Sequence, residues 1–243
     1  MSATYLMAVV AIIAMATVVQ GVSGFGFSLA SMPLLAALLG VEQALAIQTT
    51  LGIASNAATA WRARSDILRG KAKRMLIAMV AGMPFGWVML NHVSGRDLKL
   101  LVGIVVGVLA LLLAVHVRIR STGTIVDLVS GFFSGVLSTS TGTNGPPLVL
   151  GLSGRRLPAA QQRATLSTCF AVANVIVFAA LLWSGRIDAA VVTAVAASLP
   201  VLLVTSVLGH RIFERLHQHH YERIVVVLLF ASAAVAIVSG LGT

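Results

Sequence analysis

Charged residues are scarce in this chain of 243 residues: only 10% are Asp, Glu, Lys or Arg, against about 25% in an ordinary soluble domain. Hydrophobic residues make up 58% of the sequence instead. A water-soluble fold of this length cannot bury so much apolar surface, whereas a chain surrounded by lipid does not need to. The composition therefore predicts an all-α integral membrane protein that lies in a lipid bilayer.

The residues that enzymes and metal sites require are rare as well. Cys169 is the single cysteine and lies in an apolar run, which excludes a disulfide framework and a multi-cysteine metal site. Nearly all of the seven acids fall at the ends of expected helices, and no Ser/His/Asp set, HExxH or P-loop motif occurs. We therefore expect no enzyme activity, no cofactor, no metal site and no ATP-driven transport by this chain alone.

Acidic residues are outnumbered by basic ones, 7 against 17, so the formal net charge is +10. The basic residues stand in short clusters between apolar runs and do not alternate with aromatics, so we expect no nucleic-acid binding. Clusters of this kind are typical of loops at the cytoplasmic face of a membrane protein. The first of them begins at Arg62, so the basic start of a cleaved signal peptide is missing and the first apolar segment is expected to be retained.

Apolar runs of about 20 residues, enough to cross a bilayer, occur six times. They cover residues 43–60, 74–91, 98–116, 164–183, 189–208 and 222–241. Two further apolar regions, 4–40 and 125–153, are interrupted in the middle by Gly, Ser and Thr. Such interruptions survive in lipid only beside protein or a wet cavity. The short arms of 125–153 predict a re-entrant hairpin, and 4–40 is either a hairpin or two tilted passes.

A broken unit followed by three helices occurs twice, in residues 1–120 and 121–243. Details recur at a constant offset of 118: Thr50 and Asn56 match Thr168 and Asn174. This predicts one transport domain built from two repeats. Glycines four residues apart in several segments predict close helix packing.

Charge predicts how the two repeats face. If each broken unit makes an even number of crossings, four loops that hold 14 of the 17 Lys and Arg residues share one side. They are loops 61–74, 116–124, 153–163 and 209–223. The positive-inside rule makes that side cytoplasmic, places both termini outside the cytoplasm and inverts one repeat relative to the other. Inverted repeats with broken helices are typical of secondary transporters.

The densest polar stretch at membrane depth runs from Ser138 to Gly145 and includes Thr141, Thr143 and Asn144. Pro146, which follows it, favours the first turn of a new helix. The N–H groups and positive dipole end of such a half-helix suit an anion. A polar turn packed against protein is the competing interpretation.

Further candidates for substrate binding come from three other places. The first interruption contributes Gly24, Gly26 and Ser28, which would mirror the second from the other side. Arg163 could grip an oxyanion or could be an ordinary positive-inside charge. Polar residues of two helices could line the same path, although hydrogen bonding between helices also explains them. These are Gln48, Thr50, Asn56, Thr168 and Asn174.

The order of these motifs resembles the sulfite exporter TauE/SafE family of anion permeases. The resemblance covers essentially the whole chain and is carried by short motifs in a fixed order. They are Gly24-Phe25-Gly26 with Pro33, Thr50, Asn56, Gly82-x-Pro84-x-Gly86, Gly142-x-Asn144-Gly145-Pro146-Pro147, Arg163-x-Thr165 and Asn174. The resemblance implies transport of sulfite, sulfoacetate, thiosulfate or related anions across a bacterial inner membrane, with Asn144, Gly145 and Arg163 in the site.

The expected function is therefore secondary transport of a small anion by alternating access, with a proton or sodium as the possible coupling ion. Two alternatives stay open: an anion channel, and a non-enzymatic membrane subunit of a larger assembly. A channel would differ by conducting much faster than alternating access permits. The sequence does not set the oligomeric state or the direction of transport.

Overall fold

The computed structural model describes residues 3–23, 26–115, 123–153, 157–213 and 218–242, and within these ranges it contains helices and no strand. The helices, in chain order, are α1 (Ala3–Ser23), α2 (Phe27–Leu39), α3 (Val41–Arg62), the 3-10 helix η1 (Arg64–Asp66), α4 (Arg69–His92), α5 (Gly95–Ala114), α6 (Thr124–Ser140), α7 (Gly145–Ser153), α8 (Ala159–Trp183), α9 (Ala189–Phe213) and α10 (Gln218–Leu241). The all-α class is confirmed, and each predicted apolar span falls on a helix.

Four helices of this described part are long and apolar enough to cross a membrane: α1 over Ala3–Gly21, α4, α8, and α9 over Ala189–Ser206. α3 has 22 residues, about 33 Å of helix, but its apolar run is broken by buried polar side chains that include Gln48 and Asn56. Large hydrophobic side chains such as Phe85 are exposed along the outward faces of the bundle. The chain is a multi-pass membrane protein.

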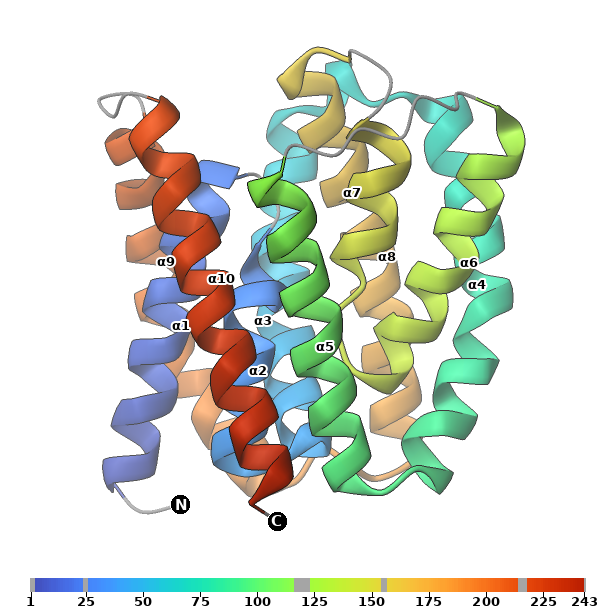
Figure 1. The fold of residues 1–243 in the computed structure, drawn as a ribbon. Coiled ribbons are helices and arrows are strands. Elements are labelled where there is room, and N and C mark those ends of the chain that lie inside the picture. Colours follow the sequence, from blue (N-terminus) through green and yellow to red (C-terminus); the bar gives the residue numbers. More distant parts are fainter. Residues whose placement is uncertain (1–2, 24–25, 116–122, 154–156, 214–217, 243) are drawn as a thin grey trace.

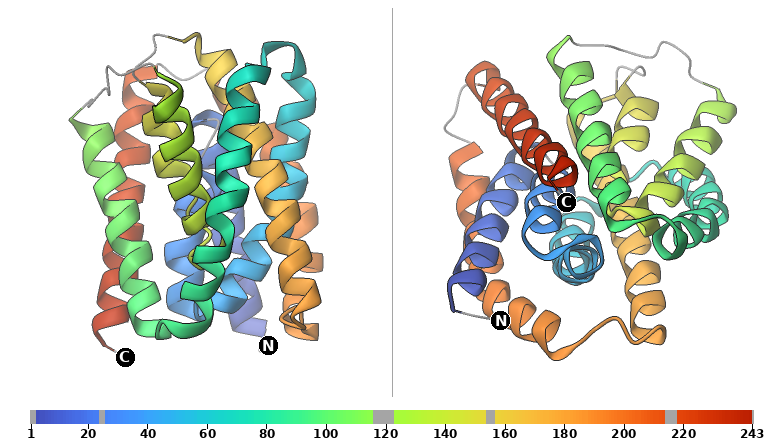
Figure 2. Two further views of the ribbon diagram at one scale, coloured as in Figure 1. Left: turned by 90° about the vertical axis from the view of Figure 1, so that its right-hand side faces the viewer. Right: turned by 60° about the horizontal axis from the view of Figure 1, so that its bottom comes forward.

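Successive helices alternate in direction, and both ends of the chain lie at the lower face in Figure 1. The helix ends that flank the α3–α4, α5–α6, α7–α8 and α9–α10 connections lie at the upper face. This grouping agrees with the one predicted from the basic residues. α2 and α3 lie innermost, surrounded by the other helices when the molecule is seen from below (Figure 2, right).

The two interrupted regions form hairpins that open toward opposite faces (Figure 1). α1 and α2 have 21 and 13 residues, or about 32 and 20 Å, and their hairpin opens toward the lower face. α6 and α7 have 17 and 9 residues, or about 26 and 14 Å, and open toward the upper face. α7 is too short to cross a core of about 30 Å, so the hairpin over region 125–153 has the shape that a re-entrant segment requires. Region 4–40 is a hairpin with one long arm.

The second interruption is shorter than expected, because α6 continues to Ser140 and only residues 141–144 separate it from α7. The hydroxyl of Ser140 donates to the carbonyl of Val136, and that of Thr141 donates to the carbonyl of Leu137. These side chains satisfy their own hydrogen bonds on the helix, so a run of Ser and Thr does not need to end it.

Helix packing follows a regular pattern across the chain. The most extensive contacts join α4 with α6, α1 with α9, α5 with α10, and α3 with α8. If α1–α5 and α6–α10 are two corresponding units, α1 corresponds to α6, α2 to α7, and so on. Under this correspondence the α1–α9 contact is equivalent to the α6–α4 contact, and the α5–α10 and α3–α8 contacts are each equivalent to themselves. Two copies of one five-helix unit would produce this pattern.

The α4–α6 contact depends on glycine. A Cβ atom on Gly82 or Gly86 would collide with the backbone of α6 at Phe132 and Val136, and one on Gly135 would collide with the backbone of Met79. The two backbones therefore approach closely, as the spacing of these glycines predicts.

Candidate functional site

α2 and α7, the short arms of the two hairpins, both begin at one small pocket. α2 starts after Gly26, and α7 starts at Gly145. The first turn of a helix leaves backbone N–H groups without intrahelical partners. The pocket is lined by Gln20, Gly26, Phe27, Ser28, Leu29, Gln48, Asn56, Asn144, Gly145, Phe170 and Asn174. These residues come from α1, α2, α3, α8 and the start of α7.

Carboxamide side chains dominate this lining. All five, Gln20, Gln48, Asn56, Asn144 and Asn174, are at most 4% exposed. None of the described lining residues is charged. A buried amide needs hydrogen-bond partners, because its desolvation costs free energy when they are missing. The pocket is therefore suited to a polar solute or water rather than to an apolar one.

Hydrogen bonds fix the orientation of two of these amides. The amide nitrogen of Gln20 donates to the side-chain oxygen of Asn56 over 2.9 Å, and the Ser55 hydroxyl donates to the side-chain oxygen of Gln20. The amide nitrogen of Asn56 donates to the carbonyl of Gly52 over 2.9 Å. Each NH₂ group carries two hydrogens. One N–H of Gln20 and one of Asn56 thus remain for other partners.

The turn before α7 is held from two sides. The Ser134 hydroxyl donates to the backbone carbonyl of Asn144 over 2.7 Å. Gly142 has φ of 67°, a left-handed conformation that favours glycine. A Cβ atom there would also stand 2.9 Å from a methyl carbon of Leu45 and 3.0 Å from the side-chain oxygen of Gln48. Gly142 therefore lets the turn pack tightly against α3.

The offset of 118 that relates the two halves of the sequence also relates residues that line the pocket. It pairs Gly26 with Asn144 at the starts of α2 and α7, and it pairs Asn56 on α3 with Asn174 on α8. Phe27 and Gly145 are paired in the same way. The pocket is thus lined by corresponding positions of both halves, as expected for a site on an internal symmetry axis.

The structure brings together seven of the residues predicted for substrate binding and places five elsewhere. The seven that line the pocket are Gly26, Ser28, Gln48, Asn56, Asn144, Gly145 and Asn174. Thr50, Thr141, Thr143, Arg163 and Thr168 are not among the lining residues, and Gly24 lies outside the described residues.

Each of the four threonines outside the pocket lining has a local hydrogen bond. The Thr50 hydroxyl donates to the carbonyl of Ala46, and that of Thr168 donates to the carbonyl of Ala164. Thr141 and Thr143 are buried and their hydroxyl oxygens lie 2.7 Å apart. The hydroxyls of these residues hydrogen-bond to one another or to carbonyls of their own helix, which fits the interpretation of a polar turn packed against protein. Asn144 and Gly145 line the pocket, which fits the interpretation of a binding site.

Arg163 lies in the first turns of α8, eleven residues before Asn174. That separation corresponds to about 16 Å along the helix axis. Arg163 is therefore near the upper face, well away from the pocket.

Some lining residues were not predicted. Gln20 is the clearest case, since a single carboxamide in the apolar stretch before the first interruption is a detectable signal. Phe27, Leu29 and Phe170 form an apolar wall that composition does not distinguish from ordinary core. The pocket has space for about one water molecule. A larger solute requires the surrounding helices to move.

The fold and this enclosed polar pocket define a multi-pass membrane protein with two half-helices meeting inside the bundle. Comparison with known proteins identifies the family. The model of the family described as "Sulfite exporter TauE/SafE" matches residues 9–236. The chain belongs to the sulfite exporter TauE/SafE family, which is a transporter family.

One curated relative supports the match. It is the "Probable sulfite/organosulfonate exporter TauE" of Cupriavidus necator, which is 27% identical over 208 residues. The matched region covers 83% of this chain and 81% of the relative. No solved structure matches the chain.

Proposed function

We propose that this protein is a secondary transporter that moves small sulfur oxyanions or organosulfonates, such as sulfite, sulfoacetate or thiosulfate, across a bacterial inner membrane. The observation that carries the proposal is the carboxamide-lined pocket where α2 and α7 begin. Membership of a transporter family and the name of the Cupriavidus necator protein support the class of substrate.

The chemistry of the pocket favours an anion held by neutral donors. Asn144 and Asn174 offer side-chain N–H groups, and the start of α2 adds backbone N–H groups and the positive end of a helix dipole. Several such donors act together on an anion with several oxygens. The apolar wall that includes Phe27 and Phe170 gives room for the carbon chain of an organosulfonate once the helices part.

Transport by alternating access between two inverted repeats fits this architecture. The pocket joins corresponding positions of both halves, and the two hairpins open toward opposite faces (Figure 1). Rocking one half against the other would expose the pocket to each side in turn. Its small volume in this conformation favours a transporter over an open channel.

The proposal includes an orientation. The upper face, with the helix ends that flank loops 61–74, 116–124, 153–163 and 209–223, is cytoplasmic, and both termini are extracytoplasmic. The excess of Lys and Arg in these loops supports this assignment. The coupling ion in this proposal is a proton or sodium.

Uptake into proteoliposomes tests the function. The purified protein is given labelled sulfite, sulfate, thiosulfate, sulfoacetate, taurine and acetate, with and without imposed pH and sodium gradients. We expect saturable uptake of one or more sulfur anions, and loss of that uptake in Asn144→Ala and Asn174→Ala proteins that insert normally. Wild-type rates in both variants would retire the pocket as the site, and uptake of no anion would retire the transporter assignment.

A further inference from the structure

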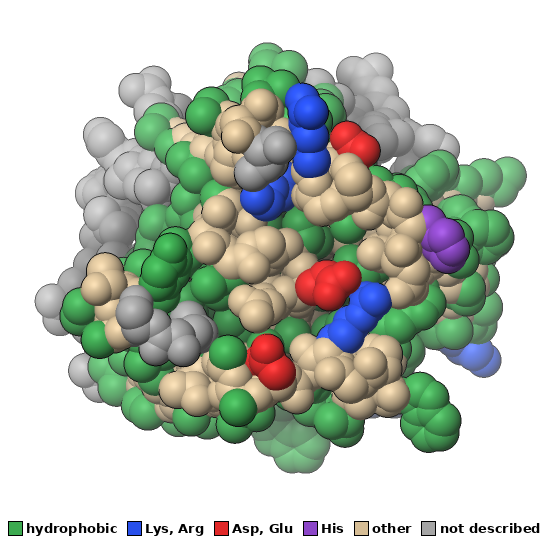
Figure 3. Space-filling model, turned by 90° about the horizontal axis from the view of Figure 1, so that it is seen from below, with side chains coloured by type: hydrophobic (Ala, Val, Ile, Leu, Met, Phe, Trp, Pro, Cys, Tyr) green, Lys and Arg blue, Asp and Glu red, His purple; other side chains and the backbone are tan. Residues whose placement is uncertain are grey.

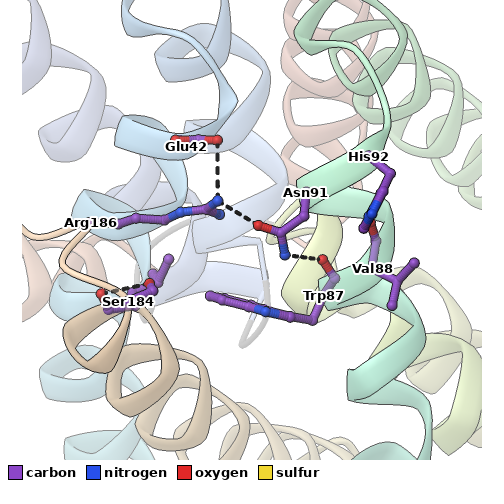
Figure 4. Close-up of polar contacts among 8 residues, drawn as sticks. Glu42, Trp87, Val88, Asn91, His92, Ser184 and Arg186 are labelled. Carbon is purple, nitrogen blue, oxygen red and sulfur yellow. Dashed lines mark hydrogen bonds and ion pairs between the residues drawn. The ribbon is translucent and has the colours of Figure 1, made fainter.

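Arg186, in the second half of the chain, makes polar contacts with two residues of the first half. It lies between α8 and α9, and its guanidinium nitrogen Nη2 donates to the side-chain oxygen of Asn91 at the end of α4 over 2.6 Å. The same nitrogen lies 3.7 Å from a carboxylate oxygen of Glu42 at the start of α3. Figure 4 shows this arrangement, with Trp87 beside it. Figure 3 shows this lower face, where charged side chains are few.

The backbone of Arg186 is held rigidly. α8 ends in a turn in which Gly185 has φ of 71°, a conformation that favours glycine. The N–H of Arg186 donates to the carbonyl of Leu181, and that of Gly185 donates to the carbonyl of Leu182. This pair of bonds is a Schellman motif. It aims the Arg186 side chain inward across the face.

The guanidinium is only partly satisfied by its neighbours. The Arg186 side chain is 22% exposed, and its Nη1 is buried without a hydrogen-bond partner among the described residues. The Trp87 ring centroid lies 5.2 Å from the guanidinium carbon, which stabilises the positive charge but offers no lone pair. A buried donor without an acceptor is costly and indicates a missing partner.

The existing acidic partner is weakly bound. Glu42 is 56% exposed, and its distance of 3.7 Å from the guanidinium is beyond a hydrogen bond. Exposed ion pairs of this kind contribute little to stability. Asn91 is held more firmly, since its amide nitrogen donates to the carbonyl of Trp87 over 2.7 Å. A competing anion would therefore displace Glu42 and leave Asn91 in place.

The Arg186–Glu42 pair lies close to the pocket along α3. Glu42 precedes Gln48, a pocket residue of the same helix, by six residues. That is about 9 Å along the axis of α3. An anion leaving the pocket toward the lower face along α3 would come to the Glu42 end of this helix, where Arg186 lies.

We propose that Arg186 forms a second anion-binding site at the lower mouth of the transport path, where it exchanges Glu42 for a small oxyanion. A planar guanidinium donates two parallel N–H bonds to a sulfite or sulfonate group. Nη1, which has no hydrogen-bond partner among the described residues, supplies a further donor. This inference rests on the proposed transport function for its physiological meaning, but the binding event stands apart from transport.

Trp87 provides a direct readout. The chain has three tryptophans, and Trp61 and Trp183 are 72% and 94% exposed. Replacing these two with Phe leaves Trp87 as the sole tryptophan, beside the guanidinium, and excitation at 295 nm avoids the signal of the two tyrosines. In detergent, titration with sodium sulfite or sodium sulfoacetate against sodium chloride of equal ionic strength is expected to change Trp87 emission saturably. No transport is needed for this signal.

Three variants of that single-tryptophan protein decide the question. Arg186→Gln is expected to abolish the saturable change. Glu42→Gln is expected to lower the half-saturating concentration by about two- to fivefold, because it removes the competing carboxylate. Arg96→Gln, which removes an exposed positive charge of the α5 start at the same face, should leave the titration unchanged.

Opposite effects of the Glu42 and Arg186 variants are the signature of exchange. If both variants weaken binding alike, the pair is only a latch between the two halves and the proposal is wrong. A response that survives Arg186→Gln would also overturn it. A saturable Trp87 signal in a protein that transports none of the anions would rule out the transport function and support the Arg186 site. Anion uptake without any Trp87 signal would support the transport function and rule out the Arg186 site.

Discussion

The side-chain amide nitrogen of Asn174 on α8 lies 2.5 Å from the point where a Cβ atom would stand on Gly52 of α3. That distance is too short for any real carbon contact, so only glycine at position 52 allows the amide to occupy this place. The carbonyl of the same glycine accepts a hydrogen bond from Asn56. Gly52 therefore sets the spacing between the two asparagines that the 118-residue offset relates.

Replacing Gly52 with Ala is expected to impair transport much more than folding. The new methyl group meets the free end of a side chain, which rotates away at small cost in free energy, but the Asn174 amide then leaves its place in the pocket. We expect uptake of the transported anion to fall by about tenfold or more, equivalent to about 1.4 kcal/mol, with a thermal midpoint close to wild type. Proteoliposome uptake and thermal unfolding in detergent measure the two effects.

The matched control is Gly107→Ala on α5, where the new Cβ atom would make an ordinary contact of 3.7 Å with Ala233. It should retain uptake. A double-mutant cycle adds a second check: in an Asn174→Ala background, Gly52→Ala should have little further effect, since the two changes act on one amide. Fully additive losses would show that Gly52 acts through some other contact.

A negative charge in the pocket should be far more harmful than the loss of an amide. We expect Asn174→Asp to reduce anion uptake below the level of Asn174→Ala, although Asp is closer to Asn in size. At about 4 Å and an effective dielectric constant of about 20, like charges repel by about 4 kcal/mol. Equal uptake by the two variants would mean that the transported solute is not an anion at this position.

Arg163 tests a different step of the same path. Because it lies about 16 Å above Asn174 along α8, a role in attracting the anion at the upper face fits its place better than a role in gripping it inside the pocket. Arg163→Gln is expected to raise the KM for uptake severalfold, leave the maximal rate nearly unchanged and weaken the salt dependence of uptake.

The control for Arg163 is Arg69→Gln, an exposed arginine at the start of α4 on the same face. Arg69→Gln should change neither the KM nor the maximal rate of uptake. A fall in the maximal rate of Arg163→Gln with an unchanged KM would instead place Arg163 in a conformational step.

Much of the fold was predictable because lipid imposes simple requirements on length and apolarity. The helices, the two interruptions and the close packing at Gly82 and Gly86 all follow from patterns that a bilayer demands. The interruption before α7 was overestimated, since the Ser140 hydroxyl bonds to its own helix and does not break it. Sequence alone does not show such bonds.

The candidate site was predictable in its carboxamides and less so in its hydroxyls. An amide such as Asn144 cannot satisfy both of its polar groups on its own helix, so it must find partners across the bundle. A threonine such as Thr168 can turn back to the carbonyl four residues earlier, as it does here. Arg163 was a candidate because its guanidinium suits an oxyanion, and the family resemblance pointed to it as well. Its distance from the pocket depends on where α8 begins, which the sequence does not show.

The α4–α6 contact should determine stability rather than transport. A Cβ atom on Gly135 would collide with the backbone at Met79, which cannot rotate away as a side chain does. Overpacking of this kind costs about 1–3 kcal/mol, so Gly135→Ala should lower the thermal midpoint clearly. Gly70→Ala, whose new Cβ atom would lie 3.9 Å from a terminal nitrogen of Arg74, should not. Equal midpoints for both variants would show that α4 and α6 separate easily.

Cysteine labelling tests whether the pocket opens at all. Cys169 is the single cysteine and is fully buried, so the wild-type protein should not react with a membrane-impermeant maleimide. Ser28→Cys, in a Cys169→Ser background, places a thiol in the pocket. If the helices part to admit an anion, this thiol should react, and the transported anion should slow the reaction.

The matched control is Thr17→Cys, which is on the α1 arm of the same hairpin, 1% exposed and outside the pocket. It should stay unreactive, because alternating access moves the helices without unpacking the core between them. Reaction of both thiols at similar rates would indicate general loosening of the bundle. Reaction of Ser28→Cys that no sulfur anion slows would separate the opening from substrate binding, and the pocket would then be a water-filled cavity rather than the transport site.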